Sequence, residues 1–125
     1  DAAGVVYYGN YLRLFEIGRT EFLRDRVGIS YKEIESRGII MPVVEAYIRY
    51  KAPAFYDDLL SIETVVSRLD SHSITFFCQI RRHDEEGLIV QGSTRLTTVE
   101  KKTGRLIRIP EEVGTSIAPF VIQVS

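Results

Sequence analysis

The sequence has few of the residues that form covalent or metal-bound cross-links. It contains one cysteine, Cys78, and two histidines, His72 and His83. A single cysteine excludes a disulfide within the chain, and three such residues do not make a zinc-type cluster. We therefore expect no structural metal, and the low cysteine content fits a reducing, cytoplasmic location.

An excess of one charge and long apolar runs are also absent. Sixteen lysines and arginines balance 17 acidic residues, for a formal net charge of −1. No overall field or basic run would therefore attract nucleic acid. The apolar runs fall short of the roughly 18 residues that a membrane helix needs, and the N-terminus lacks a signal-peptide pattern. We expect neither a nucleic-acid partner nor a membrane span.

The sequence does have enough apolar residues for one domain core. Its 125 residues are 45% hydrophobic and show no internal repeat. This length and composition predict a single domain over residues 1–125.

A helical period dominates the first third of the chain, from Asn10 to about Arg26. Asn10 is the expected cap and Gly28 the expected end. Gly18 lies within the apolar stripe, where glycine costs roughly 1 kcal/mol relative to alanine, so we expect the helix to approach a sheet closely there. The stripe contains Tyr11, Phe15, Gly18 and Phe22, flanked by Leu12, Leu14 and Leu23, and the polar face contains Arg13, Glu16, Thr20 and Arg24.

A second, short helix is predicted over Ser30–Arg37, with Ser30 and Glu33 as a capping box and Gly38 as its end. The period then changes to two, which indicates strands. The predicted strands are Val43–Tyr50 (Val44, Ala46, Ile48 and Tyr50 on one face), Leu59–Leu69 (Leu60, Ile62 and Val66 opposite Val65 and Leu69), Ile74–Arg82, Leu88–Lys101 and Arg105–Ile109. A last helical turn begins near Pro110.

This order predicts an α+β fold. Strands joined mostly by hairpins form an antiparallel sheet, and the long helix packs on its concave face. One sheet with one helix leaves strand edges and a face to cover, so we expect a dimer or a higher assembly.

The beginning of the chain resembles a known family signature. Asp1-Ala2-Ala3-Gly4-Val5-Val6-Tyr7, then Asn10-Tyr11 and Phe15-Glu16-Ile17-Gly18-Arg19, resemble the Asp-x-x-Gly-Val-Val-Tyr…Asn-Tyr…Phe-Glu-x-(small)-Arg pattern. That pattern is typical of the hotdog-fold 4-hydroxybenzoyl-CoA thioesterase family, which includes Tol-Pal-associated acyl-CoA thioesterases. Further similarity lies in 50–59 and 103–110. The family's opening strand, which precedes the aspartate, is absent from this sequence, so we expect such a strand before Asp1.

The resemblance implies that the chain hydrolyses an acyl-CoA thioester to a free acid and CoA. It implies that Asp1 is the nucleophile or the general base, and the sequence leaves both open. The backbone N–H of Tyr8, at the helix start, would polarise the thioester oxygen. The implied substrate-binding residues are Gly4, Val6, Tyr7, Gly9 and Tyr11. No metal or cofactor is implied, since CoA is part of the substrate.

The CoA phosphates need cations or hydrogen-bond donors. The family fold implies that the pantetheine arm passes near the turn before the third strand, at the interface of a homodimer or homotetramer. Arg68, Ser71, His72 and Ser73 are therefore the first candidates for CoA binding, and Arg81, Arg82 and His83 are the second.

Several residues have rival interpretations. Glu16 is the other candidate catalytic acid on the helix, although a structural pair with Arg19 is favoured. Cys78 is interpreted as a core residue, and Asp57 and Asp58 as turn residues. Many Tol-Pal-type members have histidine where this chain has Tyr8, which mildly favours an aromatic or broad acyl group.

Two alternative functions remain open beside acyl-CoA hydrolysis. One is a non-catalytic module that binds an acyl group or CoA without turnover. The other is an acyl carrier protein thioesterase, for which the sequence shows no clear basic docking patch.

Overall fold

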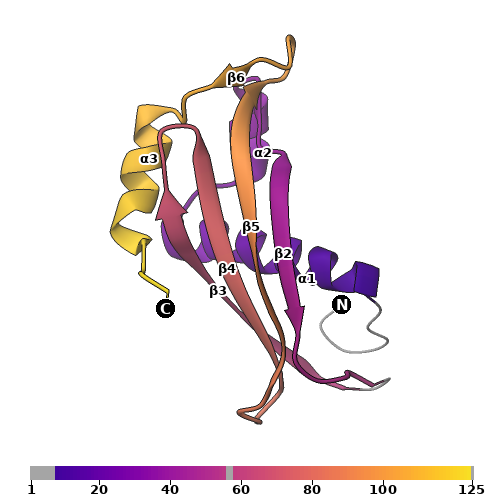
Figure 1. Ribbon diagram of the computed structural model, residues 1–125. Helices are drawn as coiled ribbons and strands as arrows, with labels where there is room; N and C mark the ends of the chain where they lie inside the picture. Colours follow the sequence, from indigo (N-terminus) through magenta and orange to yellow (C-terminus); the bar gives the residue numbers. More distant parts are fainter. Residues whose placement is uncertain (1–7, 56–57, 125) are drawn as a thin grey trace.

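The long helix predicted at the beginning of the chain is α1, Tyr8–Phe22 (Figure 1). The computed structural model describes residues 8–55 and 58–124, with side chains from Tyr11 onward. The helix begins two residues before the expected cap, so Asn10 lies inside it and the predicted cap is wrong. Helix boundaries commonly differ from expectation by one or two residues. Among the described helices, none combines the length and apolar character needed to cross a membrane.

The end of this helix is wider than an α-helix. A π-helical turn, η1, covers Leu23–Val27, and Gly28 then takes a left-handed conformation with φ 86°. The N–H of Gly28 returns to the carbonyl of Leu23, which confirms Gly28 as the predicted stop. Leu23, the first residue of this turn, is 1% exposed.

The second helix, α2, covers Tyr31–Ser36 and confirms the predicted cap. The N–H of Glu33 donates to the Oγ of Ser30 at 3.2 Å. Gly38 follows with φ 81°, a conformation that side-chain-bearing residues rarely adopt.

The sheet has six strands: β1 (Ile39–Ile40), β2 (Val43–Tyr50), β3 (Leu60–Leu69), β4 (Ser73–Arg82), β5 (Leu88–Glu100) and β6 (Leu106–Ile107). All named pairings are antiparallel, and β3, β4 and β5 form the predicted run of hairpins. Strand β2 instead pairs with the other side of β5, so the connection from β2 to β3 crosses the sheet rather than forming a hairpin. The short strand β1 is not predicted from the sequence.

Two bulges change the predicted faces. An irregularity between Val66 and Arg68 in β3 brings Leu69 opposite the buried Ile74, so Leu69 packs on the core rather than away from it. A second irregularity, between Val43 and Glu45, leaves Val44 49% exposed instead of facing the helix. A one-residue slip moves each following side chain to the other face of the sheet.

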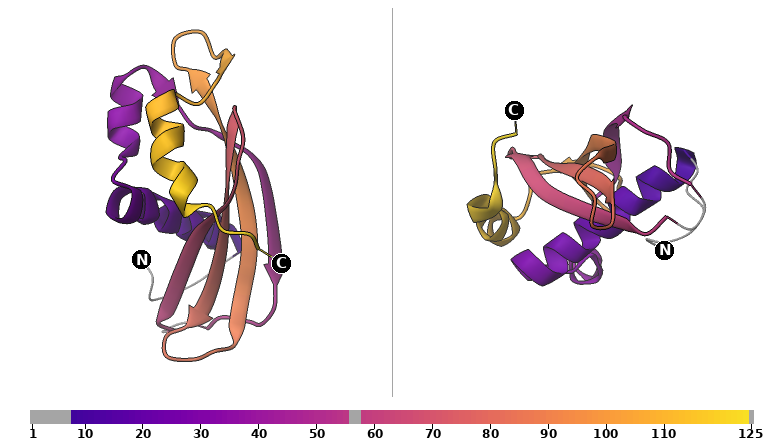
Figure 2. Two further views of the ribbon diagram at one scale, coloured as in Figure 1. Left: turned by 90° about the vertical axis from the view of Figure 1, so that its left-hand side faces the viewer. Right: turned by 90° about the horizontal axis from the view of Figure 1, so that it is seen from below.

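The helices all cover one face of the curved sheet, and the opposite face has no helix in the described structure (Figure 2). The final turn predicted near Pro110 is a longer element, α3 (Glu111–Ile117), followed by the 3-10 helix η2 (Ala118–Phe120). Between helices and sheet lie two apolar clusters. The first contains Tyr11, Leu14, Phe15, Leu60, Cys78, Ile80, Ile89 and Val90; the second contains Phe22, Leu23, Val66, Ile74, Phe76, Leu96, Val113 and Ile117.

Helix α1 crosses the sheet in close contact at Gly18, as predicted. A Cβ on Gly18 would lie 2.5 Å from the Oγ1 of Thr64 and 2.9 Å from the Cγ2 of Ile62. Both atoms belong to β3, so any side chain at position 18 would push the helix away from the sheet.

Replacing this glycine tests the contact directly. We expect Gly18→Ala to lower the free energy of unfolding by about 1–3 kcal/mol, because overpacking a tight contact costs more than the gain in helix propensity. Gly114→Ala is the matched control: it is also helical, and its Cβ would meet nothing closer than the Cγ2 of Ile109 at 3.9 Å. This control should be neutral or stabilising by about 0.5–1 kcal/mol. Equal urea midpoints for the two variants would contradict the close approach.

Candidate active site

The first turn of α1 is the chemically distinctive end of the helix. Its leading backbone N–H groups have no acceptor within the helix, and no acidic side chain occupies the turn. The helix dipole adds positive potential at the same place, which suits an oxygen that gains negative charge. Tyr8 and Gly9 belong to this turn, as predicted. Asp1, Gly4, Val6 and Tyr7 lie outside the described residues.

An aromatic pair lies just beyond this turn. Tyr11 is 4% exposed, and its ring centroid lies 5.7 Å from that of Tyr50 at the end of β2. Ile48 and Ala54 pack against the same apolar cluster. The helix start therefore stands beside an apolar, aromatic wall formed by the end of β2 and the residues after it.

The connection after β2 is fixed by one arginine. Arg82 of β4 forms an ion pair with Asp58, with 3.1 Å between Nε and Oδ2, and donates to the carbonyl of Pro53 at 2.5 Å. Its guanidinium also lies 5.5 Å from the ring centroid of Phe55. Asp58 accepts the N–H of Phe55 at 2.7 Å, which confirms its predicted turn role, whereas Asp57 lies outside the described residues.

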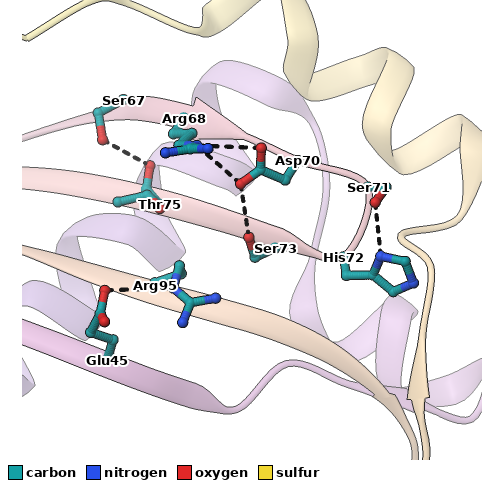
Figure 3. A network of polar contacts seen from close by, with 9 residues as sticks. All are labelled: Glu45, Ser67, Arg68, Asp70, Ser71, His72, Ser73, Thr75 and Arg95. Atoms are coloured by element: carbon teal, nitrogen blue, oxygen red, sulfur yellow. Dashed lines mark hydrogen bonds and ion pairs between the residues drawn. The ribbon is translucent and has the colours of Figure 1, made fainter.

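The predicted CoA residues surround the turn between β3 and β4 (Figure 3). Arg68 pairs with Asp70 at 3.1 Å, and the buried Ser73 donates to the same carboxylate at 3.3 Å. Ser71 and His72 form a separate contact of 2.8 Å between Oγ and Nδ1. Figure 1 places this turn at the far end of the sheet from the start of α1, so one chain does not bring the two sets together.

The second set of CoA candidates lies at the end of β4. Arg81 pairs with Glu63 at 3.5 Å, and His83 contacts both Ser61 and Asp84. Arg82 is occupied by the connection after β2. These contacts give each of the three residues a structural role within the chain.

The structure shows the surroundings of Cys78 and Glu16, two residues with rival interpretations in the sequence. Cys78 is buried beside Thr64 at 3.2 Å, and burial raises the pKa of its thiol, so it is a core residue as predicted. Glu16 is exposed. The predicted pair between Glu16 and Arg19 is wrong, because no ion pair joins them and Arg19 is only 6% exposed.

Sequence reasoning missed the burial of Arg19. The signal was its spacing, four residues after Phe15 and three before Phe22, which places it within the apolar stripe of α1.

Among the described residues, no group of three His, Cys, Asp or Glu side chains could hold a metal ion.

The fold and the helix start define a thioesterase-like protein. The sequence model of the thioesterase-like superfamily matches residues 1–117, so the chain belongs to that superfamily. The expected hotdog fold is confirmed by solved structures: a DHNA-CoA thioesterase from Staphylococcus aureus has a TM-score of 0.85 at 28% identity, covering 93% of this chain and 78% of that one.

Two further proteins are similar over most of their length. The chain is 31% identical over 113 residues to the acyl-CoA thioesterase YbgC of Haemophilus influenzae, covering 90% of this chain and 82% of that protein. A hypothetical protein of Thermus thermophilus has a TM-score of 0.83 at 30% identity, covering 94% of this chain and 87% of that one.

The Asp58–Arg82 contact yields a stability prediction. We expect Asp58→Ala to cost about 1–3 kcal/mol of unfolding free energy, because it removes the acceptor of the Phe55 N–H and the carboxylate that pairs with the partly buried Arg82 guanidinium. Glu63→Ala is the matched control on the neighbouring arginine, in a pair whose carboxylate is 74% exposed, and should change stability by less than about 0.5 kcal/mol. Urea unfolding measures both, and a larger loss in the control would contradict the difference.

Proposed function

We propose that this chain hydrolyses acyl-CoA thioesters, with Asp1 as the nucleophile or general base. The observation that carries the proposal is the start of α1 at Tyr8, only a few residues after the Asp-x-x-Gly motif of a thioesterase-like protein. The named relatives from Haemophilus influenzae and Staphylococcus aureus act on CoA thioesters.

The proposed chemistry divides between the carboxylate and the helix. Asp1 attacks the thioester carbonyl carbon to form a mixed anhydride, or removes a proton from the water that attacks it. In both cases negative charge develops on the carbonyl oxygen. The backbone N–H of Tyr8 and its neighbours at the start of α1 then stabilise that charge, and loss of such a donor typically costs roughly 3–4 kcal/mol of barrier. CoA leaves as the thiol.

The acyl group is proposed to lie against Gly4, Val6, Tyr7, Gly9 and Tyr11. The ring pair of Tyr11 and Tyr50 supports this placement, since aromatic faces provide a large apolar contact beside the helix start. An aromatic acyl group would stack on the exposed ring of Tyr50, so aromatic acyl-CoAs belong in the substrate panel together with short-chain ones.

We further propose that two chains build the site together. Strand β2 pairs with β5 on one side only, and Val43, Val44, Tyr47 and Tyr50 along it are each at least 44% exposed. An unpaired edge with exposed apolar side chains favours pairing with another chain. In this proposal a partner also brings its own turn between β3 and β4, with Arg68, Ser71, His72 and Ser73, toward the first chain's α1.

Substitution of the carboxylate tests the proposed role. We expect Asp1→Asn to lower kcat by at least about a hundredfold on acyl-CoA substrates, because an amide can neither attack nor accept a proton. Asp25→Asn, which removes a solvent-exposed carboxylate at the other end of the helix, should keep wild-type turnover.

Other outcomes identify the rivals. Turnover kept in Asp1→Asn but lost in Glu16→Gln would transfer the role to Glu16. Ligand-induced stabilisation without turnover of any acyl-CoA would indicate a binding module, and turnover of acyl carrier substrates alone would indicate the carrier-specific enzyme.

The assembly has its own test. Light scattering should give at least twice the 14.3 kDa chain mass, and Val44→Lys with Tyr47→Lys should shift the protein toward monomer and lower kcat. Leu106→Lys is the control, since Leu106 is 58% exposed on β6 rather than on the β2 edge. A fully active monomer would contradict a site shared between chains.

A further inference from the structure

The face of the sheet opposite the helices has an apolar row between two polar rows. The pairing registers of β2, β5, β4 and β3 place four residues side by side in the apolar row: Tyr47, Ser93, Phe77 and Val65. Tyr47 is 56% exposed, and Phe77 and Val65 are partly exposed. No helix of the described structure covers this face (Figure 2). An exposed apolar patch with a polar rim is typical of a protein–protein interface.

The two polar rows end in charges of opposite sign. One row consists of Glu45, Arg95, Thr75 and Arg68 (Figure 3), and the other of Arg49, Gln91, Gln79 and Glu63. On β2 the ends are Glu45 and Arg49, and on β3 they are Arg68 and Glu63. Strand spacing and rise place these four corners about 13–14 Å apart along and across the strands.

This arrangement of charges is complementary to itself. A twofold axis parallel to the strands, between β5 and β4, brings β2 of one chain opposite β3 of a second copy. Glu45 then faces the partner's Arg68, and Arg49 faces the partner's Glu63. Each pair occurs twice about the axis, so unlike charges meet at all four corners.

The sizes of the central side chains favour the same axis. With this axis, Phe77 faces the partner's Ser93, and Tyr47 faces the partner's Val65, so a large side chain always faces a smaller one. An axis across the strands would instead place Phe77 against Phe77 and Ser93 against Ser93. Two sheets pack well when large and small side chains interdigitate across the interface.

A hollow beside the apolar row gives room for a side chain of the partner. It is a pocket of about 590 Å³, and its lining includes Thr75, Phe77, Ser93 and Val124. The C-terminal segment forms one wall, because it joins the edge of β3, where the N–H of Ile122 donates to the carbonyl of Val66 at 2.8 Å. The axis places the partner's Tyr47 next to Phe77, at this hollow.

The corner charges are available for contacts with a partner. Glu45 lies 3.6 Å from Arg95 and Glu63 lies 3.5 Å from Arg81, but the two carboxylate side chains are 70% and 74% exposed. Arg49 is exposed and forms no ion pair within the described ranges. Exposed pairs of this kind contribute little within one chain, so little is lost when the charges turn to a partner.

We propose that a second copy of this chain packs on this face, sheet against sheet, through the row of Tyr47, Phe77 and Val65. Four strands of about ten residues cover roughly 600 Å² per chain, or about 1,200 Å² in total, which reaches the range of specific interfaces. This contact is separate from the edge of β2. The two contacts together assemble four chains.

Charge reversal at one pair of corners tests the contact. Light scattering of the wild-type protein should give about four times the 14.3 kDa chain mass. Glu63→Arg and Arg49→Glu should each halve that mass, because each places like charges opposite each other at two symmetric positions and weakens association by at least about a hundredfold. The double variant should recover the wild-type mass. The two residues lie three strand spacings apart within one chain, so such a recovery requires a contact between chains.

Two further variants complete the test. Phe77→Lys should also halve the mass, because it places a charge in the apolar row. Glu35→Arg is the matched control, the same charge change at an exposed position of α2, and should keep the wild-type mass. A monomeric wild type, an unchanged mass in both single reversals and Phe77→Lys, or a folded double variant that stays at the reduced mass would overturn the proposal.

The measurement does not depend on the proposed hydrolysis. Mass is measured without substrate, so an inactive protein would leave the result unaffected. Glu63→Arg and Phe77→Lys should keep the wild-type kcat per chain, because both residues lie on the face opposite α1. Tyr47 belongs to both contacts, so Val44→Lys with Tyr47→Lys should give single chains. A wild-type mass of two chains that Glu63→Arg and Phe77→Lys leave unchanged would assign the assembly to the edge of β2 alone and contradict a contact on this face.

Discussion

The close contact between α1 and the sheet is the constraint on which the rest of the structure depends. Two glycines make it possible, Gly18 on the helix and Gly92 on β5. A Cβ on Gly92 would lie 2.9 Å from the Cε2 of Phe15, so the absence of a side chain there makes room for that ring. Phe15 is 1% exposed as a result. The helix is thereby fixed across the strands, and its first turn comes to lie beside Tyr50 and the residues that follow β2.

The sequence predicts most clearly those elements whose two faces differ. Strand β4 alternates cleanly, and its expected inward residues, Ile74, Phe76, Cys78 and Ile80, are each at most 1% exposed. Strand β2 has the predicted bounds. Because β2 lies at the edge of the sheet, Ile48 is its only residue that is not exposed. An alternating pattern reports that a strand exists, whereas its neighbours decide how much of it is buried. The bulge that turns Leu69 inward left no local signal.

The candidate site likewise has parts that the sequence predicts and parts that it does not. The carboxylate motif and the roles of its residues follow from a family resemblance. Membership of the thioesterase-like superfamily supports that resemblance. The residues from Asp1 to Tyr7 lie outside the described structure. The free N–H groups at the helix start follow from any helix that begins there. Arg19 was misjudged because arginine is rarely buried without a partner, so composition favours the surface and only its spacing within the apolar stripe contradicts it.

Retention of a buried cation is informative because an apolar residue would serve the core better. Replacing buried ion pairs by hydrophobic residues of similar size is often neutral or stabilising, and an unpaired buried cation is more costly than a pair. Arg19 lies between Phe15 and Phe22, where leucine or methionine would continue the stripe without any desolvation cost. The apolar stripe of α1 therefore does not by itself explain the burial of a guanidinium at this point. Helix α1 thus carries free N–H groups at its start and a buried guanidinium in its last turn.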